Sequence, residues 1–167
     1  MRRRTRVGAG IVGWAIGIAF AGGCATATLD VHRPIPIAIP AVAVALRDGT
    51  RGKMSPEEMK EFREIVVREL QRSGIQVVSK VTPDTTRVLG TVTEYDGGIR
   101  LVRYLTSYGP GTGIVVTRWA VAEPRTHDVG RCTIEGSVSM GTFGGSFEDV
   151  LEETGRALAR FLKGDIQ

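Results

Sequence analysis

The clearest pattern in the sequence is an alternation of apolar and polar residues between positions 130 and 140. Cys132, Ile134 and Val138 fall on one side of an extended chain, whereas Arg131 and Glu135 fall on the other. Successive side chains of a strand point to opposite faces, so this segment predicts a strand with one face in the core. Other apolar or β-branched runs predict strands over Ile37–Leu46, Ile75–Ser79, Val88–Tyr95, Ile99–Tyr104 and Ile114–Ala122.

Two other segments carry apolar residues at helical spacing. In the first, Ser55 and Glu58 match a capping box around Pro56, and Gly74 is a typical terminator. In the second, Ser146 is the expected cap and Lys163-Gly164 the expected end. The apolar stripes contain Met59, Phe62, Ile65, Val66 and Leu70 in the first helix, and Phe147, Leu151, Leu158 and Leu162 in the second.

Together these elements predict a single α+β domain. We expect a mainly antiparallel sheet of about five or six strands with two helices packed on one face, in the order β-α-β-β-β-β-α. The turn signal Asp96-Gly97-Gly98 favours a hairpin between two of the strands.

The first 23 residues have the three-part layout of a secretory signal peptide. Four arginines within residues 2–6 precede the uncharged, mostly apolar stretch Val7–Ala21, and small residues follow at Ala21-Gly22-Gly23. Together with Cys24, these small residues resemble the lipobox of bacterial lipoproteins, although Ala21 stands where leucine is usual. We therefore predict cleavage before Cys24 and a lipid anchor on its sulfur.

Two alternatives for this segment stay open. Residues 7–29 carry no charge, so a retained transmembrane anchor is one alternative. Ordinary cleaved secretion without lipid is the other. Under the lipoprotein hypothesis, residues 1–23 are the signal peptide, 24–36 a short extended tether containing Pro34 and Pro36, and 37–167 the domain. Ala25 after the cysteine is typical of an outer-membrane destination facing the periplasm.

The chain's basic character resides in the signal peptide. The whole sequence has 22 Lys and Arg against 18 Asp and Glu. Four of the arginines lie in residues 1–23, so the mature chain has 18 of each sign and is formally neutral. A neutral domain without a basic stripe is not expected to bind nucleic acid. With Cys24 lipidated, Cys132 is left alone, and its place on an apolar strand face predicts a buried thiol.

The segment Ser107–Gly113 is rich in glycine and is a candidate anion-binding loop, with Gly109, Gly111 and Gly113 as candidate residues. It leads into the β-branched run after Gly113 rather than into a helix, so an ordinary loop between strands is the competing interpretation. The two histidines, His32 and His127, lack metal-ligand spacing. We predict no metal site, no cofactor and no catalytic grouping.

Aromatic residues near these glycines are candidate contacts for a partner. They are Tyr104, Tyr108, Trp119 and Phe143. Exposed aromatics anchor many protein interfaces, whereas the alternative is that these rings complete the core.

The second half of the chain contains the motifs Arg103-Tyr104-Leu105, Gly109–Gly113 and Val115-x-Thr117-x-Trp119, followed by Gly130 and Gly136. With these motifs the sequence resembles a family of uncharacterised bacterial lipoproteins classed as a domain of unknown function. The resemblance covers roughly residues 35–163 and implies no catalytic residue. More loosely, the arrangement is similar to envelope lipoproteins that help assemble secretion channels or activate wall synthases.

The leading functional hypothesis is a lipid-anchored, non-enzymatic domain of the cell envelope, held to the membrane by Cys24, that binds an envelope protein. The alternative is a lipoprotein that binds a small molecule or anion with the Gly109–Gly113 loop. A hydrolase of envelope material is a third hypothesis, which requires acid and base residues gathered in a polar cleft.

Overall fold

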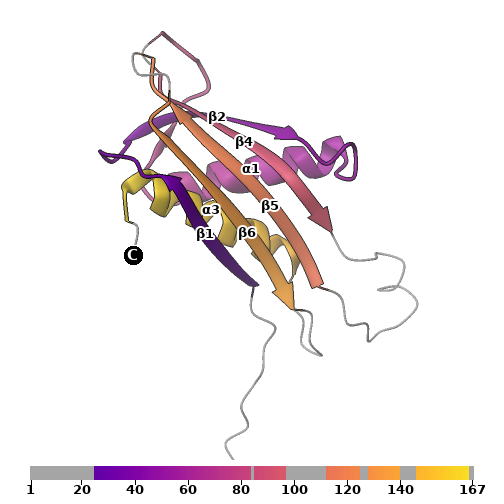
Figure 1. Ribbon diagram of the computed structural model, residues 1–167. Coiled ribbons are helices and arrows are strands. Elements are labelled where there is room, and N and C mark those ends of the chain that lie inside the picture. Colours follow the sequence, from indigo (N-terminus) through magenta and orange to yellow (C-terminus); the bar gives the residue numbers. More distant parts are fainter. Residues whose placement is uncertain (1–24, 84, 97–111, 125–127, 140–145, 166–167) are drawn as a thin grey trace, which may run out of the picture.

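The computed structural model describes residues 25–83, 85–96, 112–124, 128–139 and 146–165 (Figure 1). Within these ranges the chain forms strands and helices in one continuous unit. In chain order they are β1 (Ala25–Arg33), β2 (Ala41–Asp48), α1 (Pro56–Arg72), β3 (Gln76–Val77), β4 (Arg87–Asp96), β5 (Thr112–Ala122), β6 (Gly130–Ser139) and α3 (Phe147–Lys163).

The described strands form one six-stranded sheet in the order β1-β6-β5-β4-β2-β3. The α+β class and the two helices are confirmed, but the mainly antiparallel sheet is a mixed one: β1, β6, β5 and β4 are antiparallel neighbours, whereas β2 is parallel to β4 and β3. The physical reason is α1, which carries the chain from the end of β2 back to its beginning, so the strands that follow run alongside β2. The predicted strand Ile99–Tyr104 lies outside the described residues.

The observed element order also departs from the predicted one at the N-terminus. The segment predicted as a tether, 24–36, contains β1, which pairs with β6 from Ala25 opposite Val138 to Arg33 opposite Arg131. Its apolar residues Ala25, Ala27, Leu29 and Val31 alternate with polar ones and pack against the core. Pro34 and Pro36 therefore end a strand instead of extending a spacer. The folded domain therefore includes Ala25–Arg33 instead of starting at residue 37.

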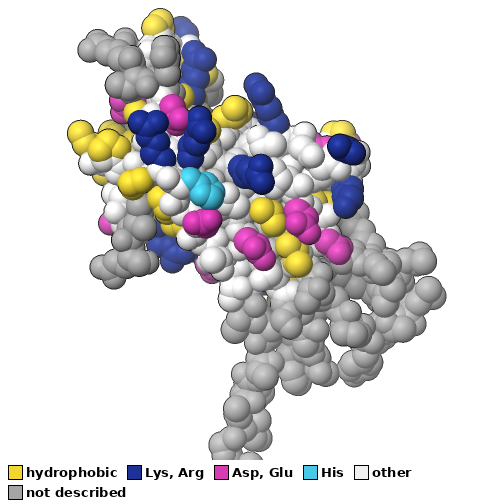
Figure 2. Space-filling model, viewed as in Figure 1, with side chains coloured by type: hydrophobic (Ala, Val, Ile, Leu, Met, Phe, Trp, Pro, Cys, Tyr) yellow, Lys and Arg dark blue, Asp and Glu magenta, His cyan; other side chains and the backbone are white. Residues whose placement is uncertain are grey.

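Both helices cover the same face of the sheet, as Figure 1 shows behind the strands. The core lies between the two layers and includes Phe62, Leu70, Trp119, Ile134 and Phe161, each at most 2% exposed. Every second residue of the long strands points into this core. The residues between them point the other way and form the face of the sheet that neither helix covers. Figure 2 displays that face, where acidic and basic side chains are interspersed.

The helices run in the same direction and are joined by charged groups around Glu69. This carboxylate is 4% exposed and accepts hydrogen bonds from Arg72 Nη1 at 2.7 Å and Arg156 Nε at 3.3 Å. Arg68 reaches across to Glu152 with an Nη2 to Oε1 distance of 2.8 Å. Gly155 permits this close approach, because a Cβ there would lie 2.9 Å from the Glu69 Cβ. The parallel direction brings both helix N-termini to one end of the sheet.

Candidate functional site

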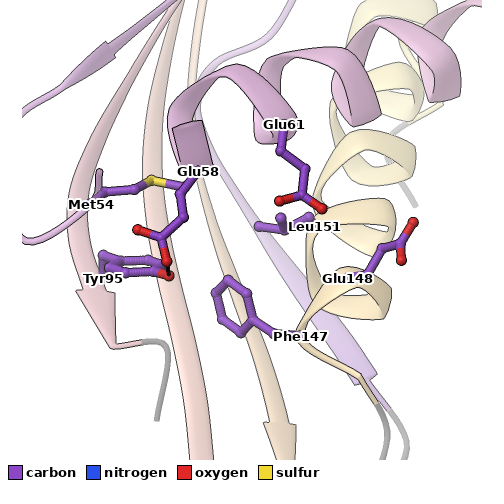
Figure 3. Close-up of a pocket in the computed structure, with 7 residues that line it drawn as sticks. All are labelled: Met54, Glu58, Glu61, Tyr95, Phe147, Glu148 and Leu151. Atoms are coloured by element: carbon purple, nitrogen blue, oxygen red, sulfur yellow. Dashed lines mark hydrogen bonds between the residues drawn. The ribbon is translucent and has the colours of Figure 1, made fainter. Parts of the chain in front are cut away.

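A hollow opens where the two helix N-termini meet the end of β4 (Figure 3). Each of its walls comes from a different element: the turn after β2, the first turns of α1 and α3, and the last residues of β4. The lining residues are Met54, Glu58, Glu61, Tyr95, Phe147, Glu148 and Leu151.

The wall formed by α1 is fixed by the capping box that the sequence predicted. Glu58 Oε2 accepts the Ser55 backbone N–H at 2.8 Å, and Ser55 Oγ accepts the Glu58 N–H at 3.2 Å. The other carboxylate oxygen, Glu58 Oε1, accepts the Tyr95 hydroxyl at 2.9 Å. One carboxylate therefore holds both the start of α1 and the end of β4.

A turn stabilised by Asp48 delivers the chain from β2 to this capping box. The Asp48 carboxylate accepts hydrogen bonds from the Thr50 hydroxyl, the Thr50 N–H and the Gly52 N–H. These bonds, led by that of the Thr50 hydroxyl, lower the pKa of Asp48. The turn includes Arg51 at φ 63° and ends near the buried Met54.

The aromatic wall consists of Tyr95 and Phe147 packed edge to face, with ring centroids 5.5 Å apart and planes at 82°. Phe147 sits against Gly113 of β5, where a Cβ would come within 2.8 Å of the ring. The second capping box, between Ser146 and Asp149, sets the helix start that carries Phe147. Three carboxylates beside two rings give the hollow a chemistry that suits a cationic or hydrogen-bond-donating group.

The candidate residues named from the sequence are only partly placed by the structure. Gly113 belongs to β5 and is buried, so it is not part of an open loop. Trp119 is 2% exposed, and its Nε1 donates a 2.8 Å hydrogen bond to Thr117 Oγ1, so its ring completes the core. Cys24, Tyr104, Tyr108, Gly109, Gly111 and Phe143 lie outside the described residues.

The predicted burial of the Cys132 thiol is confirmed. Burial raises the pKa of this thiol to about 12.

Over the part of the chain that the structure describes, no group of three His, Cys, Asp or Glu side chains is placed to hold a metal ion. Within the same residues, no helix combines the length and apolar character that crossing a bilayer requires.

Sequence reasoning missed the hollow, although it identified Glu58 as a capping residue and Phe147 as part of the α3 stripe. What brings these two residues to Tyr95 is the parallel direction of α1 and α3, which follows from strand order. The one local signal was the repeated capping motif, Ser-x-x-Glu at 55–58 and Ser-x-x-Asp at 146–149, which placed both helix starts but not their proximity.

Comparison with known proteins shows a shared fold. No protein-family model matches the chain, and no curated protein sequence matches it significantly. Among solved structures, a PelC dodecamer from Paraburkholderia phytofirmans superposes with a TM-score of 0.54 at 12% identity, covering 84% of this chain and 98% of PelC. A DUF330 protein from Xanthomonas campestris gives 0.54 at 10% identity, covering 80% and 92%.

A minor lipoprotein from Acinetobacter baumannii is also among the similar structures, with a TM-score of 0.47 at 10% identity, covering 78% of this chain and 95% of that one. The structural neighbours thus include a protein from a family of unknown function and a lipoprotein. The class that the fold defines is an α+β domain with a mixed sheet and two helices on one face, as in PelC and the DUF330 protein.

Proposed function

We propose that this chain is a lipid-anchored lipoprotein of the cell envelope whose domain binds another envelope component and catalyses no reaction. The observation that carries the proposal is the junction at Cys24. The predicted cleavage site lies directly beside the fold, since Ala25 is already paired within β1. The processed chain would therefore start at the lipid-bearing residue and continue at once into the sheet.

The same junction argues against a retained transmembrane anchor. The uncharged stretch of residues 7–29 was long enough to span a bilayer. Residues 25–29 are committed to β1, however, so a spanning helix could use only residues 7–24. Eighteen residues containing six glycines make a short and weak transmembrane helix.

Intact mass of the detergent-extracted protein tests the anchor. The expected mass is that of a chain beginning at Cys24 plus diacylglyceryl and acyl groups, and Cys24→Ala should lose this modification. Cys132→Ala is the matched control and should keep it. A full-length mass, or a cleaved chain without lipid, would refute the anchor.

Partner binding is tested separately by placing a photo-crosslinking amino acid at Glu61, in the hollow, and at Gln71, at the far end of α1. We expect one envelope component to be captured from Glu61 and not from Gln71. Because PelC is a dodecamer, light scattering of the purified protein would show whether this component is a second copy. Equal capture from both positions, or turnover of envelope material by the purified domain, would contradict the proposal.

A further inference from the structure

The junction between the lipid and the fold is too short to act as a flexible linker. Ala25 is the first residue of β1 and lies opposite Val138 of β6. One peptide bond separates it from Cys24, and a strand advances about 3.4 Å per residue. With a lipid on Cys24, the anchored residue is bonded directly to a residue that is paired in the sheet.

The same end of the sheet carries the hollow. Val138 pairs with Gly113 at the start of β5, and Gly113 contacts the Phe147 ring at the start of α3. Tyr95, near the end of β4, joins this ring to the start of α1 through Glu58. We call this surface the anchor end; it comprises the starts of β1, β5, α1 and α3 and the ends of β4 and β6. In Figure 1 the ends of β4 and β6 and the starts of β1 and β5 lie at the lower end of the sheet.

The opposite end of the domain is defined by the ends of both helices. α1 ends at Arg72, and the chain then returns to the beginning of β2, where Gln76 N donates to the Pro40 carbonyl at 2.8 Å. The large apolar side chains that are exposed among the described residues, Ile37 (78%) and Val81 (49%), lie in connections at this end. α1 runs from the anchor end to the opposite end, and its 17 residues give it a length of about 25 Å.

We propose that the domain stands on the bilayer with its anchor end against the lipid headgroups, oriented by the direct connection from Cys24 to β1. A spacer of 12 residues, as the sequence suggested, would have reached roughly 36 Å and allowed the domain to tumble. In the proposed orientation the hollow lies at the membrane surface, and Ile37 and Val81 face away from it. This inference rests on the proposed function, because it requires the lipid on Cys24.

The orientation is tested with the processed, lipidated protein in vesicles of phosphatidylethanolamine and phosphatidylglycerol that contain a spin-labelled headgroup lipid. A fluorophore is attached in separate variants at Glu57→Cys or Gln71→Cys, which are exposed positions about 21 Å apart along α1. We expect the dye at position 57 to be quenched at least threefold more than the dye at position 71. Equal quenching, or stronger quenching at position 71, would overturn the inference.

The wild-type chain controls for labelling of Cys132, which should not react because it is buried.

The cause of the orientation is tested by inserting 12 glycine and serine residues between Cys24 and Ala25. This insertion keeps the lipid and should bring the quenching ratio to about one, whereas an unchanged ratio would show that the junction does not orient the domain.

Mass and vesicle flotation separate the two proposals. A protein without lipid that fails to float would overturn the proposed function and this inference together. A lipidated, vesicle-bound protein with equal quenching at both positions would overturn the inference alone.

Discussion

The indole ring of Trp119 occupies the space that a side chain at Gly90 would fill. The two residues are directly opposite each other on β5 and β4. A Cβ at Gly90 would lie 2.5 Å from Cζ3 of Trp119, and 2.7 Å from the Leu46 side chain. Because Gly90 has no side chain, the indole of Trp119, the largest buried side chain of the core, fits opposite it.

Gly90→Ala should therefore lower the free energy of unfolding by about 1–3 kcal/mol, because neither the ring nor the strand can move away without cost. Urea unfolding followed by circular dichroism measures the loss. Adding Trp119→Phe, which frees part of the space, should make the double variant more stable than the sum of the single losses predicts. Strictly additive losses would count against this packing.

Thr117→Val should destabilise the domain by about 1–3 kcal/mol, since it leaves the buried Nε1 of Trp119 without the hydroxyl that accepts its hydrogen. Valine has nearly the same shape as threonine, so packing changes little. Thr93→Val, on a half-buried hydroxyl, is the control and should cost below about 0.5 kcal/mol. The same urea titration compares them, and equal losses would disprove a special role for Thr117.

Glu69→Gln should cost about 2–4 kcal/mol, because Arg72 and Arg156 would lose a buried carboxylate partner. Glu64→Gln removes a carboxylate from the same helix, but there the pair with Lys60 is exposed and its atoms are 4.0 Å apart. This control should change stability by no more than about 0.5 kcal/mol. Thermal unfolding of the two variants gives the comparison, and a result in which both cost the same would refute the importance of burial.

Cys132 makes the stability of the domain sensitive to alkaline pH. The folded-state pKa of its thiol, about 12, is above the unfolded value of 9.0, so the folded state keeps the proton that the unfolded state loses. The contribution is complete below pH 9 and is lost as pH rises towards 12, amounting to about 1.4 kcal/mol between pH 8 and pH 10. Unfolding at both pH values should show this decline in the wild type beyond any in Cys132→Ala. Identical declines would refute it.

Local sequence signals were sufficient for most of the secondary structure. Ser55 and Ser146 cap the helices as predicted, because a cap depends on residues only three positions apart. The alternation around Cys132 and Ile134 predicted the buried face of β6, since that pattern depends on a single strand. Both kinds of signal are complete within a short segment, and the structure confirms them.

Contacts between segments that are far apart in the sequence could not be predicted from such local patterns. The parallel pairing of β2 with β4 depends on how α1 crosses the sheet. Pro34 and Pro36 favour a tether over 24–36, but Ala25–Arg33 forms a strand in which Leu29 and Val31 alternate with polar neighbours. The hollow at Tyr95 and Phe147 could not be predicted either, because helix direction and strand order together decide which side chains meet.

The pairing of β1 with β6 also sets an order of events during folding. Thr26 and Ser137 are 111 positions apart in the chain and meet across β1 and β6. Contacts of such long sequence separation form late, because a large loop must close first. β1 therefore cannot pair with its neighbour until nearly the whole polypeptide is available, and the N-terminal strand waits unpaired while the rest of the chain emerges.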